Sequence, residues 1–189
     1  MLYTRKGDSG TTKFFHTEKG ERVTKSSPIF EALGTVDELN CNLGFCKVLS
    51  EKSKDKLMVG ENKESYTEIL EKIQQYLFSL QAELGGNTFY LKNTYVEYLE
   101  KVIAEVEVVL PPIKSFLVPG GGATGAYLDI SRTVARRAER LIVFLKENNL
   151  KEINDQSLIF INRLSSALYA LARFANYQEG YTEDKPNYQ

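Results

Sequence analysis

The chain has 189 residues and a mass of 21.4 kDa, which fits one domain with its own hydrophobic core. Lysine and arginine total 24 against 25 aspartates and glutamates, so the chain lacks the basic excess typical of a nucleic-acid binder. Hydrophobic residues make up 42%, too many for a disordered chain. No apolar run approaches the ~20 residues of a membrane span and no signal core opens the chain, so we expect a cytoplasmic protein without a membrane partner.

The counts of histidine and cysteine exclude several kinds of site. A single histidine, His16, rules out the HExxH zinc motif and the paired ExxH motifs of a di-iron bundle. A Ser-His-Asp triad could use only His16, and the GxSxG motif is missing. Cys41 and Cys46 lie five positions apart in a helical pattern, so they point to different faces, and we expect both to be reduced thiols that pack in the interior.

The first 28 residues show no helical period and are rich in Thr, Gly, Ser and Lys, which predicts an ordered arm or loop. Pro28 stands where a helix could begin. Apolar residues then recur at helical spacing: Ile29, Leu33, Val36, Leu43 and Cys46. A polar stretch from residue 50 to 65 interrupts this pattern, and strand signals are weak throughout the chain.

Four more helices follow, the second ending at Gly85-Gly86 and the third at Pro111-Pro112. Residues 113–122 are predicted to form a loop, Asp155 to cap the last helix, and residues 179–189 to be a polar, frayed tail. The apolar faces of these helices are Tyr66, Ile69, Ile73, Leu77, Leu80 and Leu84; Val96, Leu99, Ile103, Val106 and Leu110; Ala126, Ile130, Val134, Leu141 and Leu145; and Leu158, Ile161, Ser165, Leu168, Ala172 and Ala175. Five amphipathic segments with short links predict one all-α domain, a five-helix bundle over residues 29–178 behind an ordered N-terminal loop.

The segment Tyr3–Thr12 reads YTRKGDSGTT and combines glycines, hydroxyls and two cations. Glycines permit positive φ, and successive amides can then converge on an anion, so the segment could cradle a polyphosphate. It could equally be an ordinary solvated turn, because Asp-Ser-Gly is common turn chemistry. No GxxxxGK[ST] motif is present, so it is not a Walker A loop.

Three arginines, Arg132, Arg136 and Arg140, recur every four residues and share one side of a helix. Arginine suits bidentate binding of phosphate or carboxylate better than lysine does. The alternative is a solvated helix face with Glu139 as a partial counter-charge. Upstream lies the stretch FLVPGGG from Phe116, which could form either a ligand wall or a hydrophobic plug under the end of the bundle. Asp37 and Glu38 are carboxylates on the first helix that would need an arginine partner if buried.

Taken together, these stretches resemble the PduO-type ATP:corrinoid (cob(I)alamin) adenosyltransferases. The match rests on YTRKGDSGTT, EALGTVDELN, FLVPGGG, SRTVARRAER and FINRLSSALYALAR, which follow one another in order from Tyr3 to Arg173. Several separate motifs in the right order make the resemblance specific.

The resemblance implies a cobalamin adenosyltransferase-like five-helix bundle that assembles as a homotrimer. ATP would lie at the subunit interfaces as a co-substrate, with Mg²⁺ and, in many members, K⁺, and the corrinoid would lie above it. The implied reaction transfers the 5′-deoxyadenosyl group of ATP to cob(I)alamin, giving adenosylcobalamin and triphosphate. A reductase and an adenosylcobalamin-dependent enzyme would then be partners.

The resemblance also implies roles for particular residues. Lys25 matches a lysine near the phosphates, and Phe116 matches the aromatic residue that closes the lower corrinoid face. Arg132 and Asp37 match an ion pair that bridges subunits. Residues around the nucleotide and its metal are matched by Arg136, Glu139 and Asn162, with Mg²⁺ held through the ATP phosphates and Glu139. The matched residues of the N-terminal ATP loop are Thr4, Arg5, Lys6, Gly7, Asp8, Gly10, Thr11 and Thr12.

Three positions depart from the family pattern: Asp129 stands where a His is frequent, Ile29 where many members have Arg, and Leu33 where Tyr is usual. The difference at Asp129 affects the contacts expected with the corrinoid and not those expected with ATP. Two other functions fit the same motifs less fully. One is a trimer that binds nucleotide and corrinoid without turnover, as a carrier or regulator, and the other is a structural bundle without a ligand.

Overall fold

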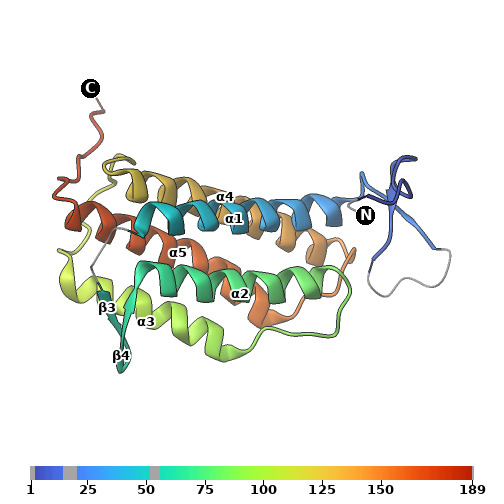
Figure 1. Ribbon diagram of the computed structural model, residues 1–189, viewed down its shortest axis with the longest axis horizontal. Helices are drawn as coiled ribbons and strands as arrows, with labels where there is room; N and C mark the ends of the chain where they lie inside the picture. Colours follow the sequence, from blue (N-terminus) through green and yellow to red (C-terminus); the bar gives the residue numbers. More distant parts are fainter. Residues whose placement is uncertain (1–2, 15–20, 52–55, 189) are drawn as a thin grey trace.

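The computed structural model describes residues 3–14, 21–51 and 56–188, so His16 lies outside the described residues. Five helices run side by side along the long axis of the molecule (Figure 1). They are α1 (Pro28–Ser50), α2 (Tyr66–Leu84), α3 (Asn93–Val109), α4 (Ala123–Glu147) and α5 (Asp155–Gln178). Helix α5 packs against α3 and α4, while α1 packs against α2 and α4. The predicted five-helix, all-α bundle is confirmed.

Local signals in the sequence set the ends of the helices. Helix α1 begins with Pro28 in its first turn, where the missing N–H of proline is not needed. Helix α2 ends at Leu84, and Gly86 then takes a φ of 95°, a left-handed conformation that favours glycine. The backbone of α3 turns extended at Leu110, just before Pro111.

Most predicted core faces are buried, including every apolar residue predicted for α2. The prediction for α4 is partly wrong, because Ile130 is 48% exposed. The predicted row mostly takes every fourth residue, but a helical turn has about 3.6 residues. Each step of four therefore rotates about 40° past a full turn, and the row drifts off the face that packs in the core. The predicted Val134 and Leu145 are buried, and the rest of the apolar buried face of α4 is made by Leu128, Ala135, Ala138 and Ile142. Its alanines allow both α1 and α5 to approach closely.

Two short antiparallel hairpins accompany the helices. Strand β1 (Thr11–Thr12) pairs with β2 (Val23–Thr24), and β3 (Lys56–Val59) pairs with β4 (Asn62–Ser65). The second hairpin lies in the polar stretch 50–65, where the strand signals in the sequence are weak. Leu57 and Val59 alternate inward against α3, and Gly60 turns the chain with a φ of 65°.

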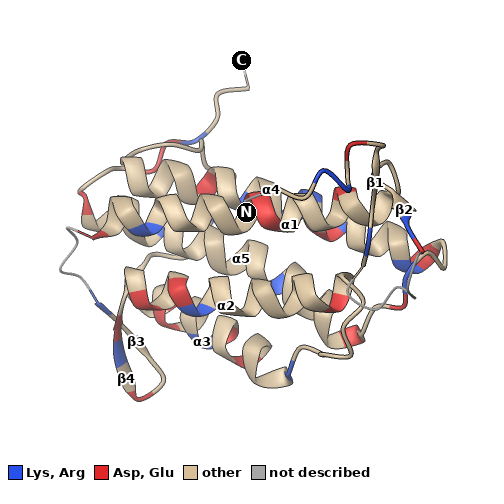
Figure 2. Ribbon diagram, turned by 45° about the vertical axis from the view of Figure 1, so that its right-hand side comes forward, with Lys and Arg blue, Asp and Glu red and all other residues tan. Residues whose placement is uncertain are grey.

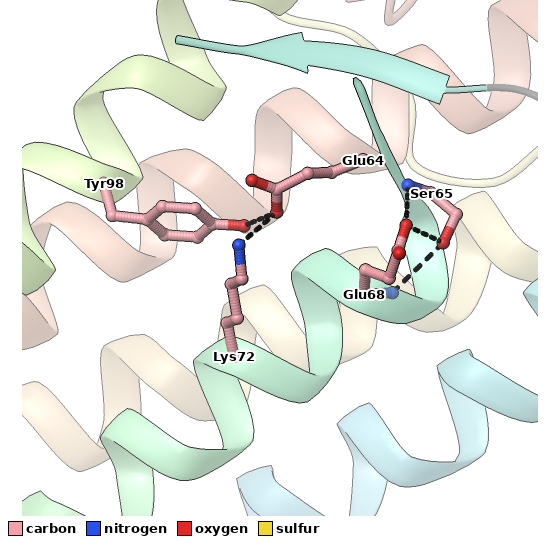
Figure 3. Close-up of polar contacts among 5 residues, drawn as sticks. All are labelled: Glu64, Ser65, Glu68, Lys72 and Tyr98. Atoms are coloured by element: carbon pink, nitrogen blue, oxygen red, sulfur yellow. Dashed lines mark hydrogen bonds and ion pairs between the residues drawn. The ribbon is translucent and has the colours of Figure 1, made fainter. Parts of the chain in front are cut away.

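A buried carboxylate fixes this hairpin to the helices (Figure 3). Glu64 accepts a hydrogen bond of 2.7 Å from the Tyr98 hydroxyl and pairs with the Lys72 ammonium at 2.8 Å. Burial, followed by the hydrogen bond to Glu64, raises the pKa of Tyr98, so its hydroxyl stays a donor. The hairpin is therefore anchored to both α2 and α3.

Two expectations about single residues need correction. The cap of α5 is Asn154, whose side chain accepts from the Gln156 amide at 2.8 Å, while Asp155 lies in the first turn and pairs with Lys146 at 2.5 Å. Both cysteines are free thiols, but only Cys46 is buried, and burial raises the pKa of its thiol. Cys41 is exposed and does not pack in the interior.

The C-terminal tail is attached to the rest of the chain at Glu183 and Asp184, whereas most of its other residues up to 188 are exposed. The Val118 amide donates to the Asp184 carbonyl at 2.8 Å, and Arg173 on α5 pairs with Glu183. By length and composition α5 could cross a membrane, but 67% of its most apolar stretch is buried among the other helices. Burial of this kind is what a core helix requires.

Candidate functional site

The predicted ATP loop is one compact turn that leads into β1. Two residues of the turn have positive φ angles, Arg5 with 60° and Gly10 with 76°. The Gly10 amide closes the turn by donating to the Gly7 carbonyl at 3.1 Å. The side chains of Thr4, Arg5, Lys6 and Asp8 are all exposed. This segment thus presents cations, hydroxyls and backbone amides to the surroundings, at an end of the molecule with further basic residues near β2 (Figure 2).

Two basic side chains, one on either side of β2, brace this loop: Arg22 directly precedes the strand and Lys25 directly follows it. Lys25 donates from Nζ to the Gly7 carbonyl at 2.9 Å, and a Cβ at position 7 would approach this Nζ to 3.0 Å, so the lysine end lies close against the glycine. Arg22 donates to the Lys6 carbonyl at 2.5 Å, the Thr11 hydroxyl at 2.7 Å and the Thr11 carbonyl at 2.7 Å. Sequence reasoning missed Arg22, because its partners are mostly backbone carbonyls.

The arginine row on α4 divides into engaged and unengaged residues. Arg132 pairs with Asp129 at 2.9 Å and places its guanidinium 5.5 Å from the centre of the Tyr169 ring. Arg137 pairs with Glu38 on α1. Arg136 is exposed, and within the described residues its guanidinium makes no ion pair. It is therefore free to bind an anion.

Glu139 does not act as a counter-charge within the arginine row. Its carboxylate accepts a hydrogen bond of 2.7 Å from the Asn162 amide on α5. The structure thus brings together two residues that the sequence assigned to the surroundings of the nucleotide. Their pairing places an amide group next to a carboxylate, and the oxygens of both groups are hard ligands of the kind that Mg²⁺ prefers.

Phe116 is 81% exposed, so it is not a hydrophobic plug under the bundle. It lines a pocket of about 530 Å³ together with Arg132, Arg136 and Tyr169. The other lining residues are Ile113, Ser115, Leu117, Ser165 and Ser166. An apolar ring and two guanidinium groups therefore face the same open pocket.

Asp37 lies exposed on α1, where it accepts a hydrogen bond of 3.2 Å from the Gln81 side chain. No ion pair joins it to Arg132 within the described chain, since Arg132 is occupied by Asp129. The N-terminal loop and the loop that carries Phe116 also lie at opposite ends of the bundle (Figure 1). One chain alone therefore does not gather all the predicted site residues around one ligand.

Comparisons with known proteins identify the family to which the chain is similar. A family model described as cobalamin adenosyltransferase matches residues 2–175. The corrinoid adenosyltransferase PduO of Salmonella typhimurium is 38% identical over 180 residues, which cover 91% of this chain and 48% of that protein. The corrinoid adenosyltransferase MMAB of Mus musculus is 35% identical over 192 residues, covering 96% of this chain and 75% of that protein. The chain thus spans about half the length of the PduO relatives.

Solved structures are similar over the whole chain. A variant of the PduO-type ATP:corrinoid adenosyltransferase from Lactobacillus reuteri, complexed with cobalamin and ATP, superposes with a TM-score of 0.85 at 34% identity. That match covers 99% of both chains. Another variant of the same protein, complexed with ATP, has a TM-score of 0.84 at 35% identity.

Proposed function

This chain belongs to the cobalamin adenosyltransferase family, and we propose that it transfers the 5′-deoxyadenosyl group of ATP to cob(I)alamin, giving adenosylcobalamin and triphosphate. The observation that carries the proposal is the pocket that Phe116, Arg132 and Arg136 share. It offers an apolar surface to a corrinoid and a free guanidinium to a phosphate.

The poverty of histidine fits this chemistry, since the chain has only one. Cob(I)alamin is itself a strong nucleophile, so its attack on C5′ of ATP needs no protein base. The charge that develops is on the departing triphosphate, where Arg136 and the basic N-terminal loop would stabilise it. Holding cobalt and C5′ in line supplies much of the remaining rate enhancement.

We propose Mg²⁺ as the metal that accompanies ATP, with K⁺ as a second cation. The described residues hold no cluster of three or more His, Cys, Asp or Glu side chains. The phosphates would therefore supply most of the Mg²⁺ ligands, and the paired Glu139 and Asn162 are placed to add protein oxygens. Bound Mg²⁺ would neutralise part of the triphosphate charge.

We propose a homotrimer in which each site takes its ATP loop from one subunit and its arginine helix from the next. Support comes from the separation of the N-terminal loop and the Phe116 loop to opposite ends of one chain (Figure 1). We also infer a cytoplasmic location, a reductase that supplies the Co(I) form, and an adenosylcobalamin-dependent enzyme that takes the product. These inferences follow from the chemistry of the substrate and the product.

The test is an anaerobic assay of the purified chain with Mg-ATP and cob(I)alamin. We expect adenosylcobalamin and triphosphate in equal amounts, and no product when ADP replaces ATP. Equal rates with ADP, or no product under reducing conditions, would overturn the proposal. ATP and corrinoid binding without triphosphate release would indicate the carrier, and an unchanged melting temperature with ATP would indicate a structural bundle.

A further inference from the structure

The loop that carries Phe116 is tied to the bundle at points on either side of that residue. Arg173 on α5 is buried, and it donates to the Pro111 carbonyl at 3.2 Å, at the start of the loop. After Phe116, the Val118 amide donates to the Asp184 carbonyl in the C-terminal tail at 2.8 Å. One attachment is thus made by a helix and the other by the tail.

The same arginine connects these two attachments. Arg173 holds Glu183 in a two-pronged ion pair, with Nε–Oε1 at 2.5 Å and Nη2–Oε2 at 2.8 Å. Bidentate pairs of this kind fix orientation as well as position. Glu183 directly precedes Asp184, so the ion pair sets the place of the carbonyl that binds Val118.

A third attachment holds the glycine end of the loop. Asn176 donates to the Gly120 carbonyl at 2.7 Å and accepts from the Gly122 amide at 3.0 Å. A Cβ at position 121 would lie 2.5 Å from the Asn176 oxygen, and Gly121 has a φ of 103°. Glycine is therefore required for the loop to lie this close to α5.

The Phe116 ring itself is 81% exposed, so side-chain packing does little to hold it. Its position depends on the backbone attachments at Pro111, Val118 and Gly120. A flexible loop that became ordered only on substrate binding would lose conformational entropy at that step. Attachments that already hold the loop in the free protein make this entropic cost smaller.

We propose that Arg173 and Glu183 are positioning residues that act through the C-terminal tail to hold Phe116 at the lower face of the corrinoid. This inference rests on the proposed function, because it assigns Phe116 to that reaction. It predicts that the tail affects the corrinoid step and leaves ATP binding unchanged.

The first test compares Glu183→Gln with Asp184→Asn. Both variants remove one negative charge from the tail, but only Glu183→Gln weakens the pair with Arg173, since Asp184 takes part through its backbone carbonyl. We expect Glu183→Gln to lower kcat with cob(II)alamin and reductant about tenfold, the size of losing a charge-assisted hydrogen bond. KM for ATP should stay within twofold, and Asp184→Asn should behave like the wild type.

The second test follows the loop without any turnover. The chain contains no tryptophan, so Phe116→Trp would introduce a unique fluorophore into the loop. Adding Glu183→Gln to this variant should lower the fluorescence anisotropy of the tryptophan in the ligand-free protein, whereas adding Asp184→Asn should not. Circular dichroism confirms that each variant is folded.

Unchanged anisotropy and unchanged kcat in Glu183→Gln would overturn the positioning role while the wild type still makes adenosylcobalamin. Equal losses in both tail variants would also overturn it, because they would reflect charge alone. A wild type that makes no product would instead refute the proposed function, and the anisotropy comparison would still decide whether the tail holds the loop.

Discussion

Arg136 is exposed on α4 and, within the described residues, has no acidic partner, which is unfavourable one turn from Arg132 and from Arg140 unless an anion binds there. We expect Arg136→Lys to impair ATP use although the charge is kept, because lysine cannot form a bidentate contact with phosphate. We expect the transition state to lose about 3 kcal/mol of stabilisation, measured from the fall in kcat/KM for ATP. Arg136→Ala is the comparison: if lysine restores wild-type kcat and KM, a point charge suffices and the bidentate role is wrong.

Phe116 supplies bulk without a lone pair. Reduction of cob(II)alamin becomes easier when no axial base pushes electrons onto cobalt, and an apolar ring at the lower face excludes such a base. We expect Phe116→Ala to lose cob(II)alamin-dependent turnover far more than ATP affinity. Electron paramagnetic resonance of cob(II)alamin with the ATP-loaded protein should show a four-coordinate component in the wild type and mainly five-coordinate cobalt in the variant. An unchanged spectrum would remove Phe116 from the mechanism.

At the scale of residues, the sequence predicts those whose chemistry is unusual for a bundle. Phe116 and Arg136 stand in a glycine-rich loop and an arginine row, and the structure places them on one pocket. Arg22 and Arg173 could not be found in this way, because each donates to backbone carbonyls that no sequence pattern reveals. The pairing of Arg132 with Asp129 within the chain was also not predicted, since Asp129 was considered only as a departure from the family and Asp37 was expected as the partner.

At the scale of elements, helix α2 has a complete capping box at its start (Figure 3). Ser65 accepts from the Glu68 amide at 3.3 Å, and the Glu68 carboxylate accepts from the Ser65 amide at 2.7 Å. The hydrogen bond from the Ser65 amide, and then a second one of 2.8 Å from the Ser65 hydroxyl to the same carboxylate, lower the pKa of Glu68. The stabilisation is therefore present above the unfolded-state pKa of Glu68 and is lost as the pH falls through the folded-state pKa.

We expect Ser65→Ala to lower the free energy of unfolding by about 1 kcal/mol at pH 7. The difference in the free energy of unfolding between this variant and the wild type should become smaller in acid, because a protonated Glu68 side chain no longer favours the capping box. Urea unfolding at pH 7, and again at pH values below the ordinary pKa of a glutamate, measures both effects. Ser79→Ala on the same helix is the control, since its hydroxyl only bonds the Gln75 carbonyl, and alanine there should be neutral. If the difference in unfolding free energy between Ser65→Ala and the wild type does not depend on pH, the role of Glu68 is wrong.

The helices could be predicted because each has a long apolar period and a clear stop signal such as Gly85-Gly86 or Pro111-Pro112. The hairpin of β3 and β4 could not, because each strand spans four residues and only Leu57 and Val59 alternate inward on β3. The packing of the tail was missed for a similar reason. Its polar sequence suggests fraying, but its partner, Arg173, lies in a different element.

At the scale of the whole molecule, α4 and α1 carry apolar side chains that one chain leaves exposed. Ile130 is 48% exposed, Phe144 45%, and Phe45 44%, although each belongs to a helix that also forms the core. Asp37 is exposed on the same helix α1. Such surfaces are consistent with the trimer that we propose, in which the Arg132 of one subunit would leave Asp129 for the Asp37 of the next.

We expect Asp37→Asn to weaken both trimer assembly and adenosylation, because it strands the Arg132 charge in the interface at a cost of about 3 kcal/mol. A double-mutant cycle of Asp37→Asn and Arg132→Gln, read by sedimentation over a range of concentrations, should show coupling between the two positions. Asp129→Asn should have the opposite effect to Asp37→Asn, because it frees Arg132 from its partner within the chain and so strengthens assembly. Additive effects at positions 37 and 132, or weaker assembly in Asp129→Asn, would mean that Arg132 keeps Asp129 as its partner in the oligomer.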